Sequence, residues 1–260
     1  MTTEPANQLV AGLPKSARRR IIKASKRVDL RFGDILCEAE EPFQHVYFPE
    51  TGFISLVATV GTHHPLEMGL IGSEGMLGAT LILGLAESPL RGVVQGSGVA
   101  LRLSAAQLRQ ELKLAPSVPR ALRQYLFVLM AQLSLTAGCT RFHDVESRLC
   151  RWLLMTHDRA HGEPFDLTHQ FLADMLGVQR SAVTIAAGKL QERGLVAYTR
   201  GRIRVLDRKG LESASCPCYL ASTRTYERLM SGGRPDRSEN IRASAYEWER
   251  TDGERRAPYP

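Results

Sequence analysis

The polar and basic side chains at positions 167–190 are spaced so that several of them could contact the edges of DNA bases. A guanidinium such as that of Arg180 can bind guanine through two hydrogen bonds, and hydroxyl groups can reach a base edge or a phosphate. An exposed Ile185 would suit a thymine methyl group, although it could instead pack against a neighbouring hairpin. The candidate DNA-contacting side chains of this segment are Thr168, Gln179, Arg180, Ser181, Thr184 and Ile185.

Two short helices joined by a tight turn would hold these side chains in place. Thr168 is a good N-cap for a first helix that ends at Leu176, and Gly177 can take the positive φ of a tight turn. A second helix is expected at about 180–193, and the small Ala173 lies where it must cross the first. This order predicts a helix-turn-helix whose second helix enters the major groove. The expected buried residues of the second helix are Val183, Ala186, Ala187 and Leu190.

Positions 195–206 have the pattern of a β-hairpin that turns at 200–202. Ile203 and Val205 alternate with arginines, so the apolar side chains would face the core and the arginines would face outward. From 165 to 210 the chain has eight basic and four acidic residues, and its formal net charge is +7. Arginines on such a wing would neutralise phosphates, which positions a domain on DNA without reading its sequence. The wing arginines are Arg200, Arg202 and Arg204.

The first part of the chain has short apolar runs between 28 and 103, separated by glycine, proline and charged residues. Such spacing is typical of a small antiparallel sandwich or barrel. A short helix is expected before it, at 14–27. Ser104 and Gln107 form a capping box, which predicts the start of another helix after the β domain. The expected fold class is therefore α+β.

A long helix is expected after Pro116 and Pro119, because apolar side chains recur there at intervals of three and four residues and Gly138 would end it. One side of this helix could cover the β domain, and the other could pair with a second copy as a coiled coil. The alternative is a helix buried within one chain, but the width of the apolar stripe favours a dimer. The residues assigned to this dimer helix are Leu122, Tyr125, Leu129, Gln132 and Thr136.

These patterns divide the chain into five parts, and the last is expected to be a polar tail that is mobile at 225–260. The parts are an N-terminal helical segment at 1–27, a β effector domain at 28–115, a dimerisation helix at 116–138, a winged helix-turn-helix domain at 139–215 and the polar C-terminal tail at 216–260.

The chain resembles the CRP/FNR family of bacterial transcription regulators over about residues 28–215, best in the stretches RFGDILCEAEEPFQHVYFPETGFISLV and LTHQFLADMLGVQRSAVTIAAGKLQERGLVAYTRGRIRVLDRKGLE. The resemblance implies a jelly-roll-like β-roll sensor domain, a long dimer helix, a hinge near 138–144 and a winged helix-turn-helix. It further implies a homodimer in which an effector reorients two DNA-reading helices toward half-sites ~34 Å apart. Double-stranded DNA and RNA polymerase are the implied partners.

The effector is where the chain departs from the family pattern. Family members that bind cyclic nucleotides use a Gly-Glu-x-Gly turn for the ribose and an arginine for the phosphate, whereas the turn at 75–78 has Met76 in place of the acid. A cyclic nucleotide is therefore disfavoured, and it would need Glu74 and Arg91 as substitutes. An iron–sulfur cluster is not expected either, because no cysteine precedes Cys37. The candidate effector-pocket residues are Glu74, Gly75, Met76, Gly78 and Arg91.

Cys216 and Cys218 flank a proline just beyond the wing, and two thiols so close could bind a metal or oxidise. No further ligand pair lies at zinc-site spacing, so we expect two reduced cysteines and no metal site. The five cysteines are odd in number and scattered, which fits a reducing compartment. Since neither a membrane span nor a secretory signal is evident, the cytoplasm is the expected location.

The chain lacks the motifs of common enzymes. It has no G-x-S-x-G nucleophile elbow, no H-E-x-x-H zinc motif and no phosphate loop, so catalysis is not expected. The main alternative to a DNA-binding regulator is a small-molecule-sensing module that acts through protein partners. Arg180 and the wing arginines favour DNA, because a protein-docking domain would not need them.

Overall fold

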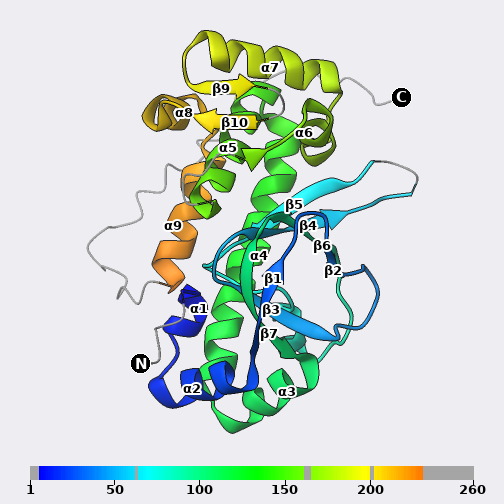
Figure 1. The fold of residues 1–260 in the computed structure, drawn as a ribbon, viewed down its shortest axis with the longest axis vertical. Coiled ribbons are helices and arrows are strands. Elements are labelled where there is room, and N and C mark those ends of the chain that lie inside the picture. The colour runs from blue at the N-terminus through cyan, green and yellow to red at the C-terminus, as the bar shows by residue number, and fades with distance from the viewer. Residues whose placement is uncertain (1–5, 62–63, 161–164, 200–201, 231–260) are drawn as a thin grey trace, which may run out of the picture.

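The computed structural model describes residues 6–61, 64–160, 165–199 and 202–230. A β-roll in the N-terminal half and a helical domain with a small sheet in the C-terminal half are joined by one long helix (Figure 1). The predicted α+β class is confirmed. Among the described residues, we find no helix with the length and apolar character needed to cross a membrane.

Two short helices precede the β-roll, α1 (Gln8–Ala11) and α2 (Lys15–Ala24). The second is the helix expected at 14–27, with Pro14 at its N-cap, but it ends at Ala24, and Lys26 and Arg27 belong to the first strand of the roll. The buried Asn7 fixes α1 to the roll, because its side-chain amide donates hydrogen bonds to the carbonyls of Pro49 and Gly75, both at 2.8 Å.

The β-roll consists of two antiparallel sheets that face each other across an apolar core. The first sheet has the order β1-β7-β3, from β1 (Lys26–Leu30), β7 (Gly98–Ser104) and β3 (His45–Pro49). The second has the order β2-β6-β4-β5, from β2 (Ile35–Cys37), β6 (Arg91–Gly96), β4 (Phe53–Ala58) and β5 (Leu66–Ile71). A 3-10 helix, η1 (Ala79–Leu83), follows β5.

The helices after the roll begin where the sequence predicts. The capping box of Ser104 and Gln107 opens α3 (Ala105–Leu114), as expected. The long helix, α4 (Ser117–Phe142), then runs from the base of the roll to the C-terminal domain (Figure 1). The expected end at Gly138 is wrong. The helix continues for one more turn, because a glycine in a helix interior only weakens the helix.

The C-terminal domain packs around its own core. Asp144 caps its first helix, as expected, through a 3.0 Å hydrogen bond from the backbone N–H of Ser147. Its three strands have the order β8-β10-β9. The elements are α5 (Val145–Arg159), β8 (Phe165–Asp166), α6 (His169–Leu176), α7 (Arg180–Glu192), β9 (Val196–Thr199), β10 (Arg202–Val205) and α8 (Arg208–Ala214).

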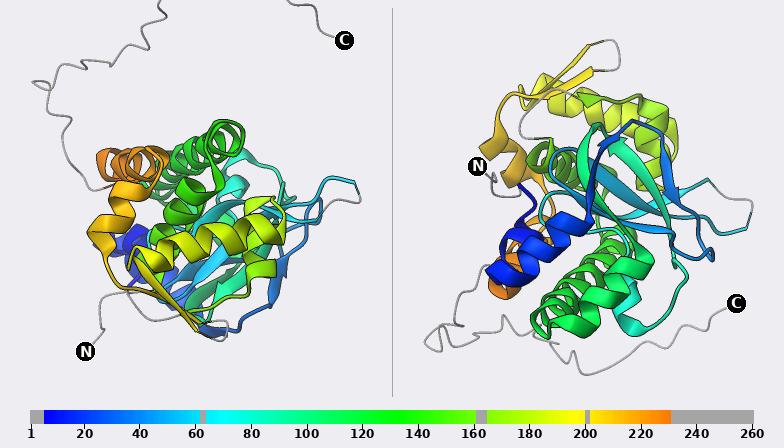
Figure 2. Two further views of the ribbon diagram at one scale, coloured as in Figure 1. Left: turned by 90° about the horizontal axis from the view of Figure 1, so that it is seen from above. Right: turned by 60° about the horizontal axis from the view of Figure 1, so that its bottom comes forward.

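A final helix, α9 (Cys218–Met230), contradicts the expectation of a polar tail at 216–260. It lies against α4 and reaches back to the N-terminal half (Figures 1 and 2). The Tyr219 hydroxyl donates to Asp158 at 2.9 Å, and the Tyr226 hydroxyl donates to Gln8 at 3.1 Å. The prediction failed because only Cys218 and Tyr219 of α9 are buried, so the helix lacks a clear apolar face in the sequence and makes its contacts partly through tyrosine hydroxyl groups. The rest of the expected tail, 231–260, is outside the described residues.

Candidate nucleic-acid interface

The outer face of α7 carries the predicted contact residues. Arg180 and Ser181 lie in the first turn of the helix, and all of the predicted residues from 179 to 185 are exposed. Ile185 is 63% exposed, so the alternative in which it packs against the hairpin does not hold. The opposite face is the predicted core face, with Val183, Ala186, Ala187 and Leu190 all buried.

The turn before α7 has the expected geometry. Gly177 adopts the left-handed conformation, with φ 62° and ψ 43°. The next residue closes the turn, because the Val178 N–H donates to the carbonyl of Ala173 at 3.0 Å. Thr168 is the N-cap of α6, since its hydroxyl oxygen accepts a hydrogen bond from the Phe171 N–H at 3.1 Å. These contacts fix the angle at which α7 leaves α6, and so the direction of its exposed face.

Charged side chains of α5 contact the C-terminal ends of α6 and α7. Glu146 accepts from Arg193 at 2.8 Å and lies 3.6 Å from Lys189 at the end of α7. The buried Arg148 donates to the carbonyl of Leu176 at the end of α6. A cation at a helix C-terminus satisfies carbonyls that lack partners within the helix. The pair α6–α7 therefore behaves as one unit with α5.

His169 and Tyr198 lie beside the predicted contact residues, and the sequence analysis missed them. The His169 ring stacks on Tyr198 at a centroid distance of 4.5 Å, and its Nδ1 lies 3.0 Å from the Thr184 hydroxyl oxygen. Desolvation and then the charge of Arg180 lower the pKa of His169, so the ring is neutral near pH 7. Since the Thr184 hydroxyl also donates to the carbonyl of Arg180, it is oriented before any partner arrives.

The wing is an antiparallel hairpin of β9 and β10, with Arg202 opposite Thr199. Ile203 is buried, while Arg202 and Arg204 are exposed on the other face, which confirms the predicted alternation. Arg200 lies outside the described residues. The wing and α7 lie at the same end of the molecule, the end opposite α2 and α3 (Figure 1).

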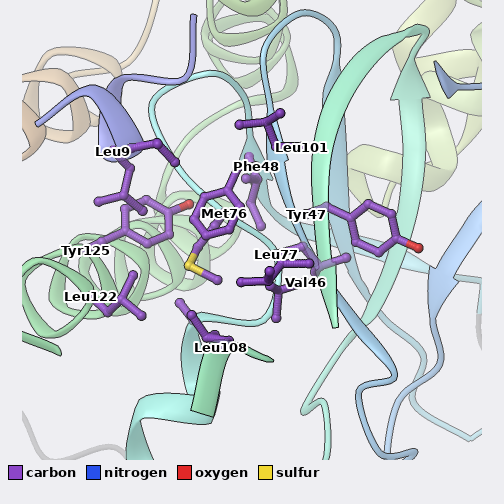
Figure 3. Packing of buried hydrophobic residues seen from close by; sticks show 14 of the residues in the cluster. Leu9, Val46, Tyr47, Phe48, Met76, Leu77, Leu101, Leu108, Leu122 and Tyr125 are labelled. Atoms are coloured by element: carbon purple, nitrogen blue, oxygen red, sulfur yellow. The ribbon is translucent and has the colours of Figure 1, made fainter. Parts of the chain in front are cut away.

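The predicted effector residues do not come together. Met76 is fully buried and packs in the core near Leu122 and Tyr125 (Figure 3). Glu74 is turned toward α5, where its carboxylate pairs with Arg159 at 2.6 Å. Arg91, on β6, pairs with Glu38 at 2.6 Å instead. The geometry therefore does not support the idea that Glu74 and Arg91 take the place of the missing ribose and phosphate ligands.

The other two predicted positions are glycines that the backbone requires. At Gly75 a Cβ would collide with the side chain of Tyr125, so α4 approaches the turn more closely than any side chain would permit. Gly78 has a φ of 95°, a conformation that glycine adopts without strain. Both glycines therefore serve the packing of the 75–78 turn against its neighbours.

An apolar cavity of about 220 Å³ lies between the β-roll and α4, next to this turn. Met76 and Leu77 line it from the roll, and Leu129 and Leu133 line it from α4. Among its described lining residues, only Thr80 and Ser88 have polar side chains and none is charged.

The residues assigned to the dimer helix are turned inward, so they form the side that covers the β-roll and not the side that could pair with a second copy. All five are buried within the single chain: Leu122, Tyr125, Leu129, Gln132 and Thr136. The side of α4 that faces solvent instead carries Phe127 and Met130, which are 52% and 58% exposed. The apolar stripe of α4 is wide because it packs on the roll and on α9, and periodicity alone could not separate the two faces.

Three comparisons place this architecture among known proteins. The family described as the Crp-like helix-turn-helix domain matches residues 147–214. The global nitrogen regulator of Synechocystis sp. is 27% identical over 176 residues, which are 64% of this chain and 77% of that protein.

Two solved structures have the same fold. One is the c-di-GMP responsive global regulator CLP of Xanthomonas campestris, with a TM-score of 0.60 and 19% identity, over 75% of this chain and 100% of that one. The other is a CRP/FNR family transcriptional regulator from Thermus thermophilus, with a TM-score of 0.58 and 20% identity, over 73% of this chain and 98% of that one. Both likenesses extend over about three quarters of this chain and show its fold.

Proposed function

We propose that the chain is a DNA-binding transcription regulator of the CRP/FNR type, and that it acts as a homodimer whose two α7 helices read a two-fold symmetric operator. RNA polymerase is then the partner through which operator binding changes transcription, and the cytoplasm is the place of action. The observation that carries this proposal is the outer face of α7, where small polar side chains, Arg180 and Ile185 are exposed above a fully buried core face.

Each side chain on α7 has a distinct expected role. Arg180 is at the N-terminal end of the helix, where a guanidinium can bind guanine through two hydrogen bonds. Ile185 is one turn further along and suits a thymine methyl group. Arg204 on the wing contacts phosphate, which adds affinity for any sequence. Arg202 and Arg200 are expected to contribute in the same way.

The exposed side of α4 supports a parallel dimer. Phe127, Met130, Ser134 and Ala137 follow one another at intervals of three, four and three residues, the spacing of a coiled-coil seam. An exposed phenylalanine and methionine on one helix face are favourable to bury against the same face of a second copy. The dimer places two α7 helices on one side of the assembly.

The cavity between the β-roll and α4 supports a mainly apolar effector rather than a cyclic nucleotide. Its lining offers no charged group to a ribose or a phosphate. The Thr80 hydroxyl has no hydrogen-bond partner in the described part of the chain, so it can bind a single polar group of such a ligand. Because α4 forms one wall, filling the cavity acts directly on the dimer helix.

Selection from randomised duplex DNA at ~150 mM salt tests the proposal. We expect an enriched motif with two inverted half-sites about ten base pairs apart. Arg180→Ala should lose ~1–3 kcal/mol of discrimination at one position of each half-site, whereas the matched variant Arg204→Ala should weaken all sequences alike and flatten the salt dependence. Equal losses on every sequence for Arg180→Ala would rule out its role in reading bases.

A further inference from the structure

Four metal-binding side chains meet where α4 ends and α9 begins. Cys139 lies in the last turn of α4 and His143 is its C-cap, while Cys216 and Cys218 flank Pro217 between α8 and α9. One ligand atom from each of the four residues can be chosen so that all lie within 4.8 Å of one another. The two halves of this cluster are 75 and 77 residues apart in the chain, which is why spacing along the sequence did not connect them.

Two of the six separations between these atoms match the edges of a tetrahedral zinc site, and all six are within 4.8 Å. The Sγ atoms of Cys139 and Cys216 are 3.5 Å apart, and Cys218 Sγ is 3.6 Å from His143 Nδ1. Zinc binds thiolate at about 2.3 Å and imidazole at about 2.0 Å, so ligand atoms at tetrahedral angles lie roughly 3.5–3.8 Å apart. The cluster therefore needs only small side-chain adjustments to close around an ion.

Local structure brings each pair of ligands to the same side. Residues four apart on a helix share a face, and α4 continues past Gly138 far enough to place Cys139 and His143 in this relation. The second pair is fixed because the Cys216 N–H donates to the carbonyl of Ser147 at 3.4 Å, and α9 starts at Cys218. Two thiols on either side of a proline can then turn toward the end of α4.

Burial and charge also suit a closed metal site. Cys139, Cys216 and Cys218 are 1%, 3% and 7% exposed, while His143 is half-buried and leaves one side for entry. Three thiolates, one imidazole and one divalent zinc ion carry one net negative charge. The buried Arg148 and Arg151 on α5 can balance it.

The partners of these two arginines are uncharged: Arg148 donates to the carbonyl of Leu176, and Arg151 donates to the side chains of Thr136 and Met155. Neither has a carboxylate within ion-pair distance among the residues that the structure describes, and both act electrostatically on Cys139. The Nε atom of Arg151 is buried without a hydrogen-bond partner in the same part of the chain. A negatively charged centre beside them would account for positive charge buried at this junction.

We propose that Cys139, His143, Cys216 and Cys218 bind one zinc ion, with three thiolates and one imidazole as ligands. Three cysteines and one histidine are a typical ligand set for structural zinc, and soft thiolates favour zinc over magnesium or calcium. Binding forms three Zn–S bonds and one Zn–N bond and releases the three thiol protons to solvent. With all four positions filled by protein, the ion has no open position for catalysis.

The ion would join the last turn of the long helix to the segment that follows the wing. It would therefore fix the angle at which α4 enters the DNA-binding domain, and loss of the ion would free that junction. An effect on DNA affinity rests on the proposed function, but zinc binding itself does not. If zinc is present and no operator is found, the site stands and the proposed function fails.

Metal analysis of the reduced full-length protein tests the site. We expect about one zinc ion per chain in the wild type and in the matched control Cys37→Ser, whose thiol lies in the β-roll far from the cluster, and loss of zinc in Cys216→Ser. Replacement of zinc by Co²⁺ should give the intense visible absorption of a tetrahedral cobalt–thiolate site. This measurement on the wild type does not depend on how the variants fold.

Three results would overturn the proposal. The first is a wild-type protein that is metal-free after growth with zinc and gives no cobalt absorption. The second is a zinc content that is unchanged in Cys216→Ser. The third is a Cys139–Cys216 disulfide, found by mass spectrometry in metal-free protein isolated without added oxidant. If zinc is bound, a chelator should lower the Tm of the wild type, and readdition of zinc should restore it.

Discussion

Glu67 offers a quantitative test of how the β-roll and the DNA-binding domain are joined. It lies on β5 and is 7% exposed, and its carboxyl group accepts a hydrogen bond from the indole N–H of Trp152 on α5 at 2.8 Å. The other oxygen meets the Ser55 hydroxyl, which also lies 2.6 Å from the side-chain oxygen of Gln95. The Ser55 hydroxyl has only one proton for its two contacts with the oxygens of Glu67 and Gln95. A protonated Glu67 would supply the second proton, so that both contacts are hydrogen bonds.

Desolvation by burial raises the pKa of Glu67 from 4.5 to about 7, against the opposing effects of Ser55, Trp152 and nearby arginines. One pKa unit corresponds to about 1.4 kcal/mol, so the difference amounts to ~3 kcal/mol. Between pH 4.5 and about 7, Glu67 is protonated in the folded state and ionised in the unfolded state. This stabilisation is complete below about pH 4.5 and is lost as the pH rises through about 7.

Glu67→Gln removes the ionisation and keeps a donor for Ser55 and an acceptor for Trp152. We expect it to raise the free energy of unfolding by ~2–3 kcal/mol at about pH 8 and to leave it nearly unchanged at about pH 4. Urea unfolding at both pH values, followed by far-ultraviolet circular dichroism, measures the difference. The exposed Glu192→Gln on α7 is the matched control and should behave like the wild type at both pH values.

An equal or lower stability of Glu67→Gln at about pH 8 would refute the reasoning, because the cost of an ionised Glu67 at this interface would then be absent. A parallel change at both pH values would refute it as well, because the effect would then come from packing rather than from a proton.

Three further changes follow from the geometry. Gly177→Ala should destabilise the protein by ~1–2 kcal/mol, because it forces a left-handed conformation and places a Cβ 2.8 Å from Leu66 Cδ1; unchanged urea unfolding would contradict this. Phe127→Asp should shift the sedimentation profile from dimer to monomer without lowering the Tm of the monomer, and a persistent dimer would move the interface elsewhere. Tyr219→Phe should cost ~1–2 kcal/mol by removing hydrogen bonds with Asp158 and Arg208, and a loss below a few tenths in thermal unfolding would show that α9 is held by other contacts.

Local sequence signals predicted the helix-turn-helix well. Thr168, Gly177 and Val178 act on backbone groups only a few residues away, so their types alone define the turn. The capping box at Ser104 and the alternation around Ile203 are local in the same sense. Such features can be predicted because the residues that decide them are neighbours in the chain.

Most of the missed features depend on contacts between distant segments; the continuation of α4 past Gly138 is the exception. The inward face of α4 could be identified only once the β-roll and α9 were in place. In the same way, Cys139 and Cys216 come together because α9 turns back along α4, which no spacing rule along the chain contains. The apolar nature of the cavity beside Met76 could likewise be identified only from the fold, although the methionine in place of an acid already argued against a ribose ligand.

The course of α9 has a mechanical consequence. Besides the direct contacts of β5 with α5 and α6, two helices link the DNA-binding domain to the β-roll half: α4 enters it, and α9 leaves it and returns to Gln8 and the backbone of Glu74. A body on a single rod can swing and twist freely about its joint. A body on two adjacent rods keeps mainly the motion in which one rod slides along the other, so α9 restricts the displacements of α7 that are open to this protein. A swing of the domain away from the roll requires the contacts of Tyr226 with Gln8 and Glu74, and that of Trp152 with Glu67, to break first.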